Sequence, residues 1–194
     1  HIDQEQYNRP ERVFGACAGA AMYRKSVFDD LGGFDEDFFI YQEDSDLSFR
    51  AQLAGFPCLF VPKAVVYHHV GGTSKQSSTA FSRRLKRLEH RNLIFILVKN
   101  LPGSLWFRYG LWIILAHFAL FLMQASKGFG IATLQGYVDA IRGLGPMLRK
   151  RKAIQSNRRV SPRYLSSVMD AHWIHILFEP YRRKRALRRQ GIKL

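Results

Sequence analysis

The densest cluster of ionisable side chains in the sequence is Glu43-Asp44-Ser45-Asp46, which follows an aromatic loop and opens a predicted helix. A carboxylate held at the start of a rigid element can accept a proton from a hydroxyl group that attacks a substrate. Asp44 suits this role, and Glu43 beside it could orient it through hydrogen bonds or like-charge effects. The spacing also has a purely structural interpretation, because acids favour a helix N-terminus and Asp46 can pair with Arg50 one turn later.

A second candidate site is the pair His68 and His69, which follows a predicted strand and precedes Gly71-Gly72. A neutral imidazole is a good ligand for a divalent cation, and such a cation can stabilise an anionic leaving group. Successive strand residues point to opposite faces, so the two histidines are expected to point in opposite directions. A histidine that merely ends a strand is the commoner case, and one histidine alone does not make a metal site.

Short strands are expected to position these side chains. An apolar run over residues 13–18 predicts a buried strand that meets a tight backbone feature at Gly19. Two further strands are predicted over residues 58–61 and 64–68, separated by Pro62-Lys63. The histidines therefore lie at the end of the last predicted strand.

Two short helices are predicted between those strands. Ser26 is expected to cap a helix over residues 27–31, which Gly32-Gly33 ends. Residues 44–54 fit a longer helix, with acids in the first turn where the helix dipole favours them and Gly55 after the end. The acidic cluster is thus predicted at a loop-to-helix junction.

The chain changes character after residue 79. Residues 81–98 predict a basic amphipathic helix, which Pro102-Gly103 breaks, and residues 131–148 predict another helix that leads into a run of four basic residues. Between them, residues 105–125 are almost wholly apolar, a length close to the ~20 residues that a membrane-spanning helix needs. We expect this segment to cross or lie in a membrane rather than form a buried core helix.

Charge divides the sequence in the same way. Residues 1–80 hold 7 Lys and Arg against 11 Asp and Glu, whereas the remaining residues hold 23 against 4, for a formal net charge of +15 overall. An acidic region where chemistry could occur therefore precedes a basic region suited to an anionic surface. The two cysteines, Cys17 and Cys58, lie in apolar stretches and are expected to be buried free thiols in a reducing compartment. The polar start at His1, without an initiator Met, suggests a fragment of a longer chain.

Four motifs follow one another in a specific order over about 65 residues. They are the run Phe14-Gly15-Ala16-Cys17-Ala18-Gly19, the segment Gly32-Gly33-Phe34-Asp35-Glu36, the acidic cluster with Leu47-Ser48-Phe49-Arg50, and Val66-Tyr67-His68-His69 with Gly72-Thr73-Ser74. Together they resemble the C-terminal half of the catalytic domain of family 2 glycosyltransferases, and within that family the bacterial rhamnosyltransferase branch.

The resemblance implies a fold of the α/β class. Residues 1–78 would form the C-terminal, acceptor-side half of a GT-A (Rossmann-like) domain, residues 79–160 amphipathic and apolar membrane-associated helices, and residues 161–194 a basic C-terminal tail. The nucleotide-binding half with its Asp-x-Asp type metal motif would precede these motifs in family members, and nothing before residue 13 matches it. An isolated fragment of this kind is expected to be inactive.

The same resemblance implies an inverting enzyme that moves a sugar, rhamnose in that branch, from a nucleotide-diphosphate donor to a lipid-linked or cell-wall glycan acceptor. It assigns the catalytic base to Asp44 with Glu43 beside it, and one ligand of a divalent metal (Mg or Mn) to His68. Acceptor-binding positions would be Gly19, Gly33, Phe34 and Asp35. The expected location is the cytoplasmic face of the bacterial inner membrane, against anionic lipid.

A different class of protein remains open on the residues alone. The acids could only cap a helix, and the basic tail could dock on lipid or RNA, which would make the chain a non-catalytic membrane-associated or nucleic-acid-binding adaptor. The basic runs flank apolar helices and no recognisable nucleic-acid module is present, so we expect no nucleic-acid partner.

Overall fold

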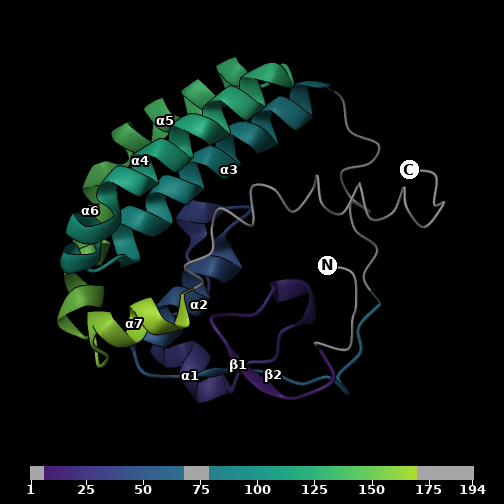
Figure 1. The fold of residues 1–194 in the computed structure, drawn as a ribbon, viewed down its shortest axis with the longest axis vertical. Helices are drawn as coiled ribbons and strands as arrows, with labels where there is room; N and C mark the ends of the chain where they lie inside the picture. The colour runs from purple at the N-terminus through teal and green to yellow at the C-terminus, as the bar shows by residue number, and fades with distance from the viewer. Residues whose placement is uncertain (1–6, 68–78, 170–194) are drawn as a thin grey trace.

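The computed structural model describes residues 7–67 and 79–169, and in this part the protein is mostly helical (Figure 1). Two short strands, β1 (Glu11–Val13) and β2 (Cys58–Phe60), pair antiparallel with Glu11 opposite Phe60. They lie at one end of the molecule, and the long helices form a bundle at the other (Figure 1). The predicted α/β fold is therefore seen only in part: the described residues form one two-stranded sheet and are otherwise mostly helical.

The strand predictions were only partly right. The first strand ends at Val13, where it was expected to begin, and no strand forms in residues 64–67. The physical reason is that beyond Val13 the backbone of Phe14, Ala16 and Ala18 bonds to side chains of a helix instead of a neighbouring strand. The prediction of a strand over residues 58–61 is confirmed to within one residue.

The two predicted short helices are present. Helix α1 spans Lys25–Asp30 with Arg24 as its N-cap, so the expectation that Ser26 caps it was wrong, since Ser26 lies inside the first turn. It ends at Gly32 and Gly33, whose φ angles of 76° and 67° suit glycine. Helix α2 spans Glu43–Leu53, as predicted to within one residue. Two 3₁₀ turns, η1 (Ala18–Ala20) and η2 (Glu36–Phe38), complete this half.

The second half is an assembly of helices (Figure 1). They are α3 (Thr79–Asn100), α4 (Gly103–Ser126), α5 (Gly130–Arg142), α6 (Leu144–Ser156) and α7 (Pro162–Val168). Pro102 precedes α4 as its N-cap, which confirms the predicted break. The helix predicted over residues 131–148 is split at Gly143, where a Cβ would lie 2.5 Å from the Phe95 ring, so the chain passes α3 closely at this point.

The main hydrophobic core joins the two halves. Phe38, Phe49 and Leu53 from the first half pack in one cluster with Phe95 and Leu101 from the second. Helix α7 closes the cluster with a completely buried Leu165, in a region that was expected to be a basic tail. The edge-to-face contact of Phe38 and Phe95, with ring centroids 6.2 Å apart, lies at this junction. The acid-bearing helix and the basic helices are therefore parts of one packed body.

Both cysteines are free, as expected, but the prediction that both are buried was wrong. Cys17 is exposed and Cys58 is half-buried. Cys17 precedes η1 at the surface, and the two-stranded sheet that carries Cys58 is too small to cover its own faces. Partial burial still raises the pKa of the Cys58 thiol.

Candidate active site

One face of α2 carries three polar side chains one turn apart, Asp44, Ser48 and Gln52. Each of them bonds to the backbone of residues 13–18: Ala18 N donates to Asp44 Oδ2 at 3.1 Å, and the other two side chains bond to three further backbone groups. The apolar segment is thus fixed along α2 by side chains at positions i, i+4 and i+8. Residues 44, 48 and 52 share one face only in a helix, so residues 13–18 keep their position only if α2 is helical.

Asp44 is the second residue of α2, which confirms the prediction that it lies at a helix start. Its second oxygen, Oδ1, accepts a hydrogen bond from Ser45 N at 2.7 Å. Backbone amides therefore orient both carboxylate oxygens, at the end of the helix where its dipole favours negative charge. Ala18 belongs to η1 together with Gly19, so the structure brings these two predicted site residues together. Their roles as base and acceptor contact remain predictions.

The loop before α2 has an unusual backbone. Phe39, Tyr41 and Gln42 have positive φ angles of 58°, 64° and 70°, which residues other than glycine rarely adopt. Such conformations persist only where the surrounding structure enforces them, and they gather at functional sites. Gln42 is the N-cap of α2, so this strained loop sets the point at which the acidic cluster enters the helix.

Asn92 of α3 holds that loop in place. Its buried side-chain amide donates to the carbonyl oxygens of Phe38, Ile40 and Tyr41, each at 2.8 Å. Arg91 adds a hydrogen bond to the Asp37 carbonyl at 2.6 Å. Asn92 was not predicted as a site residue. The one signal in the sequence was a polar amide directly before the apolar end of a predicted helix.

Asp46 faces the other side of α2 and is completely buried. The predicted pair with Arg50 is confirmed at 2.9 Å, and Lys99 and Asn100 of α3 also bond to the carboxylate, at 2.8 and 2.7 Å. Arg50 in turn donates to the Gly33 carbonyl. For Asp46 the structural interpretation of the acidic cluster is therefore correct, because its carboxylate pairs with Arg50 within α2 and ties α2 to Lys99 and Asn100 of α3.

Gly33, Phe34 and Asp35 line a cavity of about 530 Å³ together with Arg50, Lys99 and Lys150. Asp44 is not among the residues of that cavity. The four residues predicted to contact the acceptor are thus divided between two places, with Gly19 beside Asp44 and the other three at this basic pocket. The structure shows where they lie, and acceptor contact remains a prediction.

Asp35 has a clear structural task in the same pocket. Lys99 and Lys150 bond to its two oxygens at 2.5 and 2.6 Å. Burial alone would raise the pKa of the Asp35 carboxyl, but these hydrogen bonds and charges lower it to about 2. Asp35 also caps η2 by accepting a hydrogen bond from Asp37 N at 3.1 Å. Its carboxylate therefore connects η2, α3 and α6.

Glu43 and His68 bear on the expected metal. Glu43 Oε2 is buried without a hydrogen-bond partner among the residues described by the structure, so one carboxylate oxygen beside Asp44 is available. His68 lies outside the described residues. Across residues 7–67 and 79–169 no three His, Cys, Asp or Glu side chains gather as a metal site would require, so these residues do not by themselves fit the ion.

Comparison with known proteins identifies the class of protein. A model of the glycosyl transferase family group 2 matches residues 2–138, so the chain belongs to this family, whose domain is of the GT-A type. Within the family it is rhamnosyltransferase-like. The N-acetylglucosaminyl-diphospho-decaprenol L-rhamnosyltransferases of two Mycobacterium tuberculosis strains, CDC 1551 / Oshkosh and H37Rv, are 34% identical over 104 residues, which is 53% of this chain and 32% of theirs.

Rhamnosyltransferase WbbL of Escherichia coli K12 is 37% identical over 78 residues, 39% of this chain and 30% of that protein. The chain thus spans about a third of the length of the curated relatives that it matches. No solved structure matches it. The resemblance seen in the four motifs is confirmed at the level of the family and of its rhamnosyltransferase-like members.

Proposed function

We propose that this chain is the acceptor-side part of an inverting glycosyltransferase in which Asp44 is the catalytic base. The observation that carries the proposal is the geometry of Asp44, whose carboxylate is oriented by the amides of Ala18 and Ser45 at the start of α2. The strained loop before it, held by Asn92, supports the same assignment. Glu43, with one unpartnered oxygen, lies next to it in the sequence and assists.

The chemistry is a single displacement at the anomeric carbon. Asp44 accepts the proton of the acceptor hydroxyl group as its oxygen forms the new bond to the sugar, and the bond to the nucleoside diphosphate breaks on the opposite side. Attack opposite the leaving group inverts the configuration. The residues that bind the donor are expected in the N-terminal half of the domain, and they present its anomeric carbon to the acceptor beside Asp44.

The relatives suggest the substrates. Their names describe rhamnosyl transfer, and the mycobacterial ones specify L-rhamnose and N-acetylglucosaminyl-diphospho-decaprenol. We therefore propose a rhamnosyl nucleotide donor and a polyprenyl-linked glycan acceptor, with roles in polysaccharide or cell-wall synthesis. Gly19 beside Asp44 and the pocket with Gly33, Phe34 and Asp35 are the proposed acceptor contacts.

A membrane-bound acceptor fits the second half of the chain. Among the described residues one helix, α4, is long and apolar enough to cross a membrane, and only 6% of its apolar window is buried. Several Lys and Arg residues near an anionic leaflet add attraction. We propose that residues 79–160 associate with the cytoplasmic face of the bacterial inner membrane, that residues 1–78 contribute the catalytic part, and that residues 161–194 extend the basic region.

A divalent metal, Mg or Mn, belongs to the proposal because family 2 enzymes commonly use one. His68 is its proposed ligand in this chain, with the remaining ligands in the N-terminal half. The described residues supply no further ligand set, so the mechanism above assigns no step to the ion.

The test is the Asp44→Asn substitution in the full-length enzyme. Asparagine keeps the size of the side chain and can still accept one of the two backbone N–H groups, from Ala18 or Ser45, but its NH2 group cannot accept a proton. We therefore expect kcat to fall by roughly 10²–10⁴. Donor binding, measured by calorimetry, should stay the same. Asp30→Asn, which removes an exposed carboxylate at the end of α1, serves as the matched control and should retain full activity. A folded Asp44→Asn enzyme with normal turnover would remove the basis for assigning the base.

A further inference from the structure

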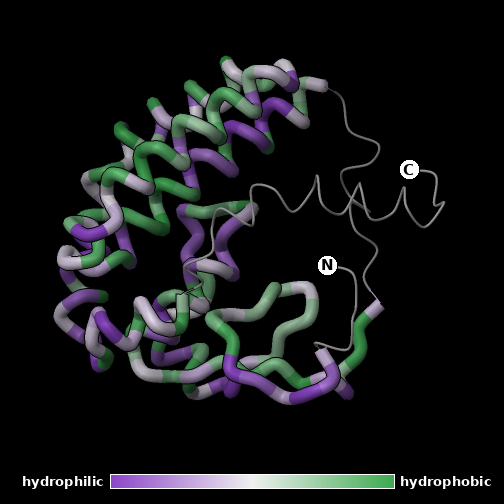
Figure 2. The backbone as a smooth tube through the Cα atoms, viewed as in Figure 1, coloured by the Kyte–Doolittle hydropathy of each residue, from purple (hydrophilic) through white to green (hydrophobic). Residues whose placement is uncertain are grey.

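The outward side of α4 is a continuous apolar surface. Its exposed residues recur every three or four positions: Phe107, Leu111, Ile114, Phe118 and Leu122. Their exposed fractions run from 51% to 96%, and between Arg108 and the end of the helix no charged residue interrupts them. Figure 2 shows this hydrophobic colouring along the bundle. Soluble proteins rarely expose a row of large apolar side chains over about four helical turns.

Helix α5 extends the surface. Its exposed apolar residues are Ile131, Leu134, Val138 and Ile141, again at helical spacing. The opposite side of α5 packs on α3, where a Cβ on Gly136 would lie only 2.4 Å from the Arg87 carbonyl oxygen. The apolar side of α5 is therefore turned away from α3. We call the exposed apolar residues of α4 and α5 the outer face.

Three aromatic rings show how the helices are aligned along their axes. Tyr137 of α5 lies between His117 of α4 and His90 of α3, with ring centroids 5.7 and 5.8 Å apart. His117 is within one turn of the middle of α4. The middle of α4 is therefore level with the middle of α3. Figure 1 shows the long helices running in the same general direction through the bundle.

An ion pair lies at the same level. Arg87 of α3, one turn from His90, bonds through two nitrogens to Asp139 of α5, and its side chain is 42% exposed. If α4 crossed a bilayer, this partly exposed ion pair would be carried close to the bilayer centre together with the charged first half of α3. Placing charges there is costly, so the packing of α3 on α5 opposes a crossing orientation.

We propose that α4 and α5 lie flat on one leaflet, with the outer face inserted among the acyl chains and α3 on the water side. The proposal rests on the membrane association proposed above and specifies its geometry. In this orientation the ion pair stays in water, and the full length of both helices contributes apolar contact. The catalytic part is then held beside the membrane surface by α3 instead of by a spanning helix.

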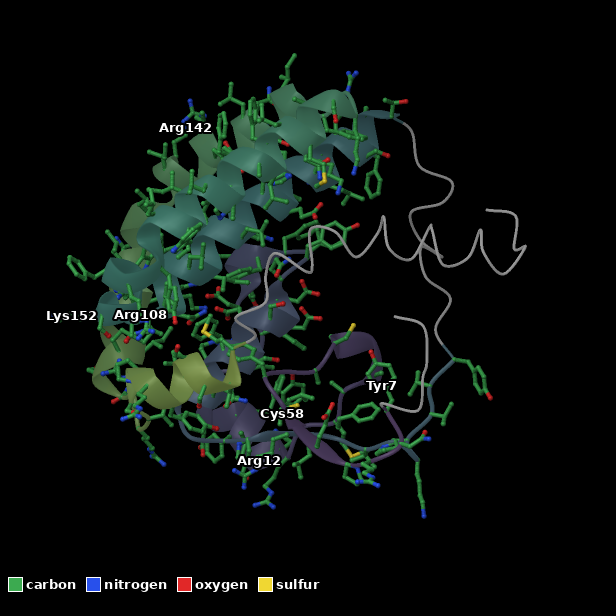
Figure 3. All side chains as sticks on the ribbon, in the orientation of Figure 1. Tyr7, Arg12, Cys58, Arg108, Arg142 and Lys152 are labelled. Carbon is green, nitrogen blue, oxygen red and sulfur yellow. The ribbon has the colours of Figure 1, made fainter. Side chains whose placement is uncertain are left out.

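Charge complementarity identifies lipid as the occupant of the outer face. The exposed charged residues that border it, Arg108, Lys127 and Arg142, are basic. The acid next to them, Asp139, is only 20% exposed and pairs with Arg87 and Arg142. Figure 3 shows Arg108, Arg142 and Lys152 along the outer edge of the helical bundle. An apolar face with a basic border matches an anionic leaflet, in which phosphate groups surround the acyl chains. Trp112, half exposed on α4, is of the type enriched at that boundary.

Site-directed spin labels distinguish the orientations. In the full-length enzyme with its native cysteines replaced by serine, nitroxides are placed by Phe107→Cys, Ile114→Cys and Leu122→Cys, and their depth is measured by power saturation on phosphatidylglycerol-containing vesicles. The outer labels are about 22 Å apart along the helix. A flat helix gives three equal depths, whereas a crossing helix gives a deep central label and shallow outer ones, and that gradient would overturn the proposal. Leu59→Cys on β2 should remain in water.

A matched pair of charge substitutions tests the contact itself. Leu111 and Leu59 are 67% and 61% exposed, so Leu111→Glu and Leu59→Glu should disturb folding equally little. Leu111→Glu should weaken vesicle binding about tenfold, and Leu59→Glu should not change it. Labels that stay in water together with no effect of Leu111→Glu would mean that protein covers the outer face. That outcome rejects membrane docking but leaves the Asp44 experiment, and hence the enzymatic proposal, unaffected.

Discussion

Asn92 places one buried amide against three carbonyl oxygens of a loop that lies more than fifty residues earlier in the chain. An amide has only two protons, so the three acceptors share them and the loop is held in one conformation. Because the loop ends at the N-cap of α2, its conformation determines where the Asp44 carboxylate points. Asn92 touches no reacting atom in the proposed mechanism and is therefore a positioning residue.

Replacing Asn92 with Ala should lower kcat of the full-length enzyme about tenfold to a hundredfold, since small displacements of a catalytic group are costly. KM for the donor should change little. Asn100→Ala is the matched control, because Asn100 is also a completely buried asparagine of α3 but bonds to Asp46. Both variants should lose about 1–3 kcal/mol of stability. Equal losses of kcat in the two folded variants would show that Asn92 acts through stability alone.

Among the helices, α3 is the one that contacts each of the elements around the candidate site. It contacts η2 and the loop through Arg91 and Asn92, and α2 through Lys99 and Asn100. Helix α6 joins through Lys150, which bonds to both Asp35 and Asp37. The relative positions of the site elements therefore depend on buried and half-buried ion pairs. Removing one partner of such a pair leaves an unpaired buried charge, which strongly destabilises the fold.

The Asp35 carboxyl predicts a pH dependence of stability. Its pKa is lowered from the ordinary value of 3.8 to about 2, so the stabilisation is fully present above pH 4 and is lost as pH falls toward 2. The shift corresponds to about 2 kcal/mol. Urea unfolding of the wild type should show this loss between pH 4 and pH 2, and Asp35→Asn should show a smaller slope in the same range. Identical slopes would contradict the role of Asp35.

Local sequence patterns predicted the helices that have regular apolar spacing and clear end signals. The helices that became α2, α3 and α4, and the break at Pro102, follow from apolar spacing, helix-end signals and proline. The segment over residues 13–18 was mistaken for a strand because apolar composition cannot reveal that its partners are helix side chains. The Asp46–Arg50 pair is local and was foreseen, whereas Lys99 and Asn100 come from more than fifty residues away. The role of Asn92 could not be predicted for the same reason, because the loop to which it bonds lies more than fifty residues earlier in the sequence.

At the scale of the molecule, the described part is one packed body, but it corresponds to only about a third of its relatives. The base and acceptor contacts proposed here need a donor held in place beside them. An incomplete set of catalytic groups loses most of the rate enhancement, because the reacting groups are no longer held in position. Activity is therefore expected to belong to the complete enzyme.

We expect the isolated 194-residue chain to show no sugar transfer above background, whereas the full-length enzyme transfers sugar from the nucleotide donor to a polyprenyl-linked acceptor. Release of nucleoside diphosphate and formation of radiolabelled lipid product measure the two sides of the reaction. Far-UV circular dichroism of the chain serves as the folding control. A folded chain with a kcat/KM equal to that of the full-length enzyme would contradict this expectation.

The contact of Asn92 with the loop before α2 also has a consequence for the order of synthesis. A ribosome adds about 5–20 residues per second, so the loop and Asp44 emerge several seconds before the side chain that arranges them. Helix α5, against which α3 packs, follows later still. A nascent or prematurely terminated chain thus contains the acidic motif without its working geometry. If Asp44 is the base, as proposed, nucleotide sugar is not consumed until α3 and the helices that pack on it have been made.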